Sequence, residues 1–322
     1  MANAISNRLD VSELDYDGIR DNLKTFLQNQ AEFSDYDFEG SGMSVLLDLL
    51  AYNTHYLSFN ANMLSNELYL DSADIRKNVV ALARQLGYTP TSVTSPLATI
   101  DITLNNVPTT VASVTMAKGT TFTTVIDRIT YIFLTNEDIT MQPTDGVYKF
   151  SNVSIYEGTN VNFQYTVDSS DVDQKFIIPS NLADTNLLTV KVQNSSTDTT
   201  TNTYTKSQTL TELDSTSKVY FLQECDDGRF EVYFGDGVLG KSVTDGNIII
   251  LEYIVTNKDA ANGASSFSLG GTVGGFTDVS ISTVSTAQGG SIAQGNNSIR
   301  FNAPLQYQSQ NRAVTVKDYE TL

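Results

Sequence analysis

Apolar residues recur at helical spacing through the first ninety residues of the chain. The longest such stretch is Ser41 to Leu70, and from Met43 onward it holds no glycine and no proline. Nothing in its backbone therefore interrupts a helix of about eight turns. Two shorter helices are predicted at 15–30 and from Ser72 to Gly87, with apolar residues spaced by three and four. The pattern predicts three helices before residue 90.

Two columns of residues run along the long predicted helix at intervals of seven. The first column is Met43, Leu50, Leu57 and Leu64, and the second is Leu47, Thr54, Ala61 and Leu68. Columns offset by three and four residues form one apolar line on a helix, called the seam below. The small residues Thr54 and Ala61 would let another backbone approach closely. Spacing alone favours an amphipathic helix that covers its own domain, and the alternative is a helix that bundles with other chains.

The pattern changes to strand alternation after the segment TPTSVTSP at Thr89–Pro96, whose two prolines indicate a boundary. Apolar and polar residues alternate over 98–104, as in a half-buried strand. The run Thr121–Leu134 predicts a hairpin that turns at Asp127-Arg128. Further strands are predicted at 153–156, 161–167, 187–192, 219–222, 229–234 and 248–256. The polar run 195–205 predicts an exposed loop or hairpin tip, and past Asn262 the chain is glycine-rich up to Ser298.

These elements predict an α+β protein. An N-terminal long-helix bundle is expected at 1–90, followed by a mainly antiparallel β-rich region at 91–297. The start of a C-terminal mixed or helical region is expected at 298–322.

Charge and composition exclude several classes of partner. The chain has 322 residues and a net charge of -18, so it lacks the clustered Lys and Arg that bind nucleic acid or anionic lipid. No apolar run approaches the roughly 20 residues of a membrane span, and the N-terminus lacks a signal-peptide core. Cys225 is the single cysteine, which excludes an internal disulfide and fits assembly in a reducing cytoplasm. We expect neither membrane insertion nor nucleic-acid binding.

Catalytic chemistry has little support in the sequence. His55 is the one histidine, so no His pair can hold a metal and no Ser-His-Asp or Cys-His set stands out. The segment GDGVLGKS satisfies the phosphate-binding loop pattern literally, but a turn and a strand follow it where a helix is needed. The Asp residues at 168, 171 and 173 lack the spacing of a calcium loop and indicate turns. We predict no catalytic residue, no metal and no cofactor.

Two downstream motifs resemble a known family. The segment FGDGVLGKSVTDGNIIILEYIVTN is similar to the central signature of the baseplate J-like family of contractile-tail phage proteins, with its turn at Phe234, Gly235, Asp236 and Gly237. The stretch from Gly289 resembles the second signature of that family and includes Arg312, Asp318 and Tyr319. The N-terminal stretch from Phe38 to Pro90 is similar to the baseplate wedge subunit of T-even-like phages. Three matching parts in the right order identify the chain as a relative of these proteins.

The resemblance implies a structural role. Such a subunit bundles through its N-terminal helices with a second copy of itself and with other wedge proteins. The wedges form a ring around the tail hub that holds the sheath and triggers it, and they contact hub and sheath-initiating proteins. The expected location is the virion tail baseplate, after assembly in the host bacterial cytoplasm. On this interpretation the seam is the interface, and the turn at 234–237 is a determinant of the fold.

One departure and one alternative qualify this hypothesis. The sequence ends at Leu322, just where the second signature should open into a helix, so we expect a shorter relative or a truncated form of the wedge subunit. The alternative function is a β-rich tail adhesin, or another tail component that binds glycan or acts on the cell wall. It predicts an exposed groove lined with aromatic side chains.

Overall fold

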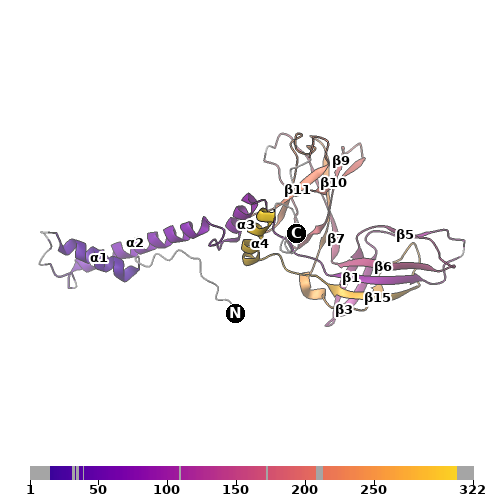
Figure 1. Ribbon diagram of the computed structural model, residues 1–322, viewed down its shortest axis with the longest axis horizontal. Coiled ribbons are helices and arrows are strands. Elements are labelled where there is room, and N and C mark those ends of the chain that lie inside the picture. Colours follow the sequence, from indigo (N-terminus) through magenta and orange to yellow (C-terminus); the bar gives the residue numbers. More distant parts are fainter. Residues whose placement is uncertain are drawn as a thin grey trace. The chain divides into compact units, whose positions relative to one another are not determined.

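The computed structural model describes residues 15–30, 33, 36–38, 40–108, 110–171, 173–207 and 213–309 (Figure 1). By its contacts the chain divides into two units, one at Met1–Tyr88 with Asn296–Leu322 and the other at Thr89–Gly295. The described part of the first unit is helical, and that of the second is built of strands. The predicted α+β class is confirmed.

Four α-helices lie in the described part of the helical unit: α1 (Tyr16–Gln28), α2 (Gly42–Glu67), α3 (Arg76–Gln85) and α4 (Asn296–Ser309). The three helices predicted before residue 90 are confirmed. The carboxylate of Asp15 accepts a hydrogen bond from the Gly18 amide and caps α1. Just past α3, Gly87 takes a positive φ of 77°, the conformation that ends many helices.

Helix α4 packs against α3 and contributes Ile299 and Ala303 to a small buried cluster with Val79 and Ala83 of α3. It opens the third predicted region, of which residues 310–322 lie outside the described residues. The predicted division into three regions stays a prediction.

The β-rich unit holds a six-stranded antiparallel sheet in the order β14-β3-β4-β6-β1-β15. Its strands are β1 (Leu97–Leu104), β3 (Thr121–Ile126), β4 (Ile129–Thr135), β6 (Tyr148–Glu157), β14 (Ser268–Leu269) and β15 (Val279–Gln288). Two short strands, β2 (Val114–Met116) and β5 (Ile139–Met141), pair separately. The β3–β4 hairpin turns at Asp127 and Arg128, whose φ values of 48° and 69° are those of a two-residue hairpin turn. The predicted hairpin is confirmed.

A seven-stranded sheet follows in the order β7-β13-β9-β10-β11-β12-β8. Its strands are β7 (Thr159–Thr166), β8 (Phe176–Ile177), β9 (Ala183–Gln193), β10 (Thr201–Lys206), β11 (Val219–Glu224), β12 (Phe230–Phe234) and β13 (Ile248–Val255). All its pairings are antiparallel except that of β10 with β11. The run 195–205 was predicted to be a loop or hairpin tip, and it forms the β9–β10 connection as far as Thr200. The prediction is wrong from Thr201 onward, because that part pairs with β9.

The seven-stranded sheet is an insertion in the six-stranded one. The chain leaves the first sheet after β6 and returns to it after β13, through the short helix η2 (Lys258–Ala261). Glu157, at the end of β6, is fully buried. Its carboxylate accepts hydrogen bonds from the Thr256 hydroxyl at 2.7 Å, the Asn257 amide at 2.9 Å and the Asn257 side chain at 2.6 Å. The two connections are therefore tied together.

Close packing and charge reinforce this junction. A Cβ added at Gly158, between β6 and β7, would lie 2.5 Å from the Val255 carbonyl oxygen, so only glycine fits there. Glu252 of the inserted sheet bonds Lys191 at 2.7 Å and Lys118, outside the insertion, at 3.0 Å. Burial acts to raise the pKa of Glu252, but the two lysines together lower it below its ordinary value.

Candidate assembly interface

Helix α2 is covered over only part of its length. Figure 1 shows α1 alongside it, and the Arg20 guanidinium pairs with the Asp48 carboxylate at 2.6 Å. Leu47 and Ala51 are the two buried residues of α2. Past Ala51 every side chain of α2 is at least partly exposed, which is unusual for a helix so rich in large apolar residues.

The structure places most of the predicted seam on this uncovered surface. Met43 is half-buried and Leu47 is buried, at the end of α2 that α1 covers. Leu50, Leu57, Leu64 and Leu68 are between 53% and 69% exposed, and Thr54 and Ala61 are exposed beside them. The Thr54 hydroxyl donates to the Leu50 carbonyl at 2.9 Å, so it needs no partner from another chain. That the seam contacts another chain stays a prediction.

A second apolar line on α2 escaped the sequence analysis. It is called the aromatic stripe here, and it consists of Val45, Leu49, Tyr52, Tyr56, Phe59 and Met63. These residues alternate in steps of four and three, and all are exposed, from 45% at Met63 to 67% at Val45. At 3.6 residues per turn the stripe lies about 150° around the helix from the seam. The same spacing rule that found the seam could have found it.

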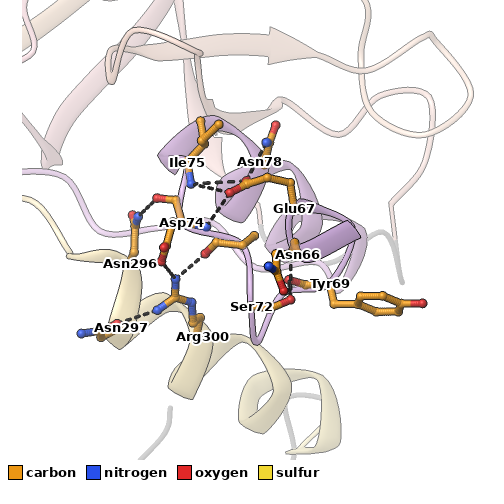
Figure 2. A network of polar contacts seen from close by, with 11 residues as sticks. Asn66, Glu67, Tyr69, Ser72, Asp74, Ile75, Asn78, Asn296, Asn297 and Arg300 are labelled. Carbon is orange, nitrogen blue, oxygen red and sulfur yellow. Dashed lines mark hydrogen bonds and ion pairs between the residues drawn. The ribbon is translucent and has the colours of Figure 1, made fainter. Parts of the chain in front are cut away.

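The turn between α2 and α3, at 66–75, is called the elbow. The Glu67 carboxylate accepts hydrogen bonds from the amides of Asp74 at 2.9 Å and Ile75 at 3.2 Å, and from the Asn78 side chain at 2.7 Å (Figure 2). It thereby caps α3, because the first amides of a helix have no acceptor within the helix itself. Burial acts to raise the pKa of Glu67, but these hydrogen bonds outweigh it and lower that pKa below its ordinary value.

Helix α4 holds the elbow from the other side. The Arg300 guanidinium donates to the Ala73 carbonyl and bonds the Asp74 carboxylate at 3.0 Å, and the Asn296 side chain donates to the Asp74 carbonyl at 2.8 Å (Figure 2). Within the elbow, the Ser72 hydroxyl donates to the Asn66 carbonyl at 2.6 Å. Residues more than 200 positions apart in the sequence therefore fix one turn.

We predict that Glu67→Gln loosens the elbow. The variant replaces one acceptor oxygen by an NH₂ group that faces N–H donors. The amides of Asp74 and Ile75 should exchange with solvent about tenfold faster, equivalent to about 1.4 kcal/mol. Hydrogen exchange read by NMR or mass spectrometry measures this. Asp71→Asn removes a charge from the same turn and should leave these amides unchanged, and equal effects of the two variants would contradict the assignment.

The predicted signature turn follows β12. The ring of Phe234 packs against those of Phe176 and Tyr204. The Asp236 carboxylate accepts from the amides of Val238 and Leu239, both at 2.9 Å, and these two bonds lower the pKa of that carboxyl. The sequence analysis chose these residues from a family resemblance. In the structure Phe234 packs on rings from β8 and β10, and Asp236 is bonded within the turn.

The signature loop also docks on a neighbouring turn. The Gly240 amide donates to the Asp214 carbonyl at 3.0 Å, and the Lys241 amide donates to that of Ser217 at 2.8 Å. No helix lies between Lys241 and β13, so the phosphate-binding loop context is missing. The other three predicted signature residues, Arg312, Asp318 and Tyr319, lie outside the described residues.

Asp214, in the neighbouring turn, should make the stability of the fold depend on pH. Hydrogen bonds from Ser217 and Thr216 lower the pKa of Asp214 from 3.8 to about 2. A lowered pKa contributes stability that is present above pH 4 and lost as the pH falls through 2. We therefore expect the melting temperature of the Asp214→Asn variant to lie below that of the parent at pH 5. The gap should close between pH 4 and pH 2 in thermal unfolding, and a gap that does not depend on pH would contradict this origin.

Few of the described residues suggest other chemistry. Within the described ranges, no group of three or more His, Cys, Asp or Glu side chains is placed to hold a metal. His55 is exposed on α2. Burial raises the pKa of the half-buried Cys225 thiol, which disfavours the reactive thiolate. No helix in the described part of the chain is long and apolar enough to cross a membrane.

Comparison with known proteins bears on both the helices and the inserted sheet. Residues 15–88 match the family described as "Baseplate wedge protein gp6-like, helical domain". Residues 162–264 match "Bacteriophage baseplate wedge protein gp6, third domain". The chain is 29% identical over 328 residues to the baseplate wedge protein gp6 of Enterobacteria phage T4, across 94% of this chain. The chain belongs to the gp6-like baseplate wedge family.

The gp6-like matches coincide with structural elements. The helical-domain match contains α1, α2, α3 and the elbow, and the third-domain match contains most of the inserted sheet and the turn at 234–237. The predicted recognition of a baseplate wedge subunit is confirmed. The chain spans about half, 48%, of the length of the T4 protein.

Among solved structures, one match is described as the cryo-EM structure of the anti-feeding prophage baseplate. The match covers 93% of this chain and 61% of the other, at 9% identity and a TM-score of 0.35. That score is too low to support an argument about the fold.

Proposed function

We propose that this protein is a non-enzymatic subunit of a contractile-tail baseplate wedge. Its α2 bundles with a second copy of the chain and with other wedge proteins. The observation that carries the proposal is the exposure of large apolar side chains along α2 past Ala51, including Leu57 at 66% and Phe59 at 60%. Contiguous apolar surface of this kind on a soluble protein marks an interaction site.

The geometry of α2 supports two separate partners. One neighbouring helix covers a single apolar line, and the seam and the aromatic stripe lie about 150° apart at 3.6 residues per turn. A helix that is apolar on opposite sides is stable only when it is covered on both. This fits a bundle in which one line meets a second copy and the other meets a different wedge protein.

The wider role rests on the family resemblance. In this proposal the bundled wedges form a ring around the tail hub, contact hub and sheath-initiating proteins, hold the sheath and trigger it. Assembly takes place in the host cytoplasm, without nucleic acid, membrane or cofactor. The turn at 234–237 serves the fold of the inserted sheet, as its internal hydrogen bonds support.

Sedimentation of the full chain tests the self-association. We expect the average mass to rise with concentration through the micromolar range, because the exposed apolar residues of α2 on one chain bind those of another. A folded chain that stays monomeric at high micromolar concentration would contradict bundling with a second copy.

The alternative, a glycan-binding tail adhesin, has no specific observation in its favour. Large exposed aromatic residues gather on α2 at Tyr52, Tyr56 and Phe59, whereas those in the described β-rich unit are Phe163 and Tyr233. Selective binding of the chain on a glycan array would favour that function over ours.

A further inference from the structure

A cavity of about 310 Å³ lies where the aromatic stripe reaches the elbow. Phe59, Met63 and Ile75 form its apolar side, and Asn62, Asn66, Glu67, Ser72 and Asp74 complete its wall. The Glu67 carboxylate is bonded to the amides of Asp74 and Ile75, and the Asp74 carboxylate is bonded to Arg300. Its volume is at the small end of ligand pockets, which span roughly 300 to 1,000 Å³. It is called the elbow cavity here, and its size and its apolar side suit a single large side chain.

The wall of the elbow cavity is held in place by the chain itself. Glu67 fixes the start of α3 through the Asp74 and Ile75 amides, and Ser72 is bonded to the Asn66 carbonyl. Arg300 of α4 adds a clamp on Asp74 (Figure 2). A site whose wall is already ordered loses little conformational entropy when it is filled.

We propose that the elbow cavity receives an apolar side chain from the aromatic stripe of a second copy of this chain. The inference rests on the proposed bundling and assigns the aromatic stripe, rather than the seam, to the contact between copies. A two-fold contact uses the same patch on both chains, so the patch must carry both a projection and a recess. The aromatic stripe has both, since Tyr52, Tyr56 and Phe59 project from it and the elbow cavity lies at its end.

Charge favours a copy of the same chain over a different one. With a net charge of -18, two copies repel each other, and carboxylates facing each other across their contact would add to that repulsion. From Leu49 to Asn66, His55 is the one residue that can carry charge near neutral pH. A surface of an acidic protein that meets a basic partner gains from carboxylates, whereas a surface that meets its own copy must avoid them. The aromatic stripe follows the second pattern, and the two carboxylates that line the elbow cavity, those of Glu67 and Asp74, are already bonded to partners within the chain.

The Met63 methyl group reports directly on the elbow cavity. The chain has five methionines, so methyl-labelled methionine gives a simple NMR spectrum of the full-length protein. Met63 is 45% exposed in the single chain, and a soluble paramagnetic agent should broaden its signal when the chain is dilute. At concentrations where the chain self-associates, we expect the signal to shift and to lose most of that broadening.

A pair of variants supplies an independent measurement. Met63→Lys places a charge in the filled cavity and should weaken self-association at least about tenfold. Met63→Leu keeps an apolar side chain of similar size and should leave self-association nearly unchanged. Self-association with a Met63 methyl that stays exposed would overturn this inference and leave the proposed bundling intact. A chain that never self-associates would overturn both.

Discussion

Leu57→Asp should abolish bundling through the seam while the chain still folds. Leu57 is 66% exposed in the single chain, so an aspartate there meets water and costs the fold little. In a bundle the same carboxylate would be buried without a partner, which costs several kcal/mol. Each 1.4 kcal/mol is a factor of ten, so assembly with wedge partners should weaken by about a hundredfold or more. Co-purification and sedimentation with co-expressed wedge proteins measure this.

Two matched variants separate interface from fold. Leu57→Met keeps an apolar side chain on the seam and should assemble as the parent does. His55→Asp adds the same charge two residues away, where side chains do not share a face with Leu57. If Leu57→Asp folds and assembles normally, the seam is not an interface.

The second large effect is expected at the signature turn. An alanine at Gly235 would place its Cβ 2.5 Å from the carbonyl carbon of Gly240 and against the Leu239 carbonyl oxygen. Both obstacles are backbone, so the turn must open and the contacts of Gly240 and Lys241 with the neighbouring turn are lost with it. We expect Gly235→Ala to destabilise the inserted sheet by about 3–4 kcal/mol, in the upper range for single substitutions. Denaturant unfolding followed by near-UV circular dichroism of the tyrosines measures the loss.

The same turn contains a control. At Gly237 the φ is +88°, but an added Cβ would come no closer than 3.4 Å to Ser242. Gly237→Ala should therefore cost only the left-handed backbone penalty of about 1–2 kcal/mol. Equal losses for the two variants would show that close packing at Gly235 is not what makes this turn a fold determinant.

Local patterns in the sequence predicted the elements that depend on local physics. The spacing of apolar residues predicted α1, α2 and α3, and the run Thr121–Leu134 predicted a hairpin that turns at Asp127-Arg128, where both residues take positive φ. Strand β15 was missed because Val279–Gln288 is rich in Ser and Thr and lies between glycine-rich runs. Its strand conformation comes from pairing with β1, about 180 residues earlier in the chain.

The candidate interface was likewise predictable only where it depends on local spacing. The seam was predictable because it is a spacing on one helix, and the aromatic stripe obeys the same rule but was not sought. The elbow was not predictable, since Glu67 and Arg300 converge on it only once α4 has packed beside α3. Which protein covers the seam was not predictable, because that depends in part on the surfaces of other proteins.

The tied connections of the inserted sheet have a mechanical consequence. A domain joined to its neighbour by a single linker can rotate about that linker. The inserted sheet is instead joined by two connecting segments, and the Glu157 carboxylate bonds them to each other. Twisting one sheet against the other would shear those bonds and the Lys118–Glu252 pair at once. The two sheets of the β-rich unit should therefore rotate together as one rigid body when a twisting force acts on either of them. Bending under load should concentrate in segments outside this unit.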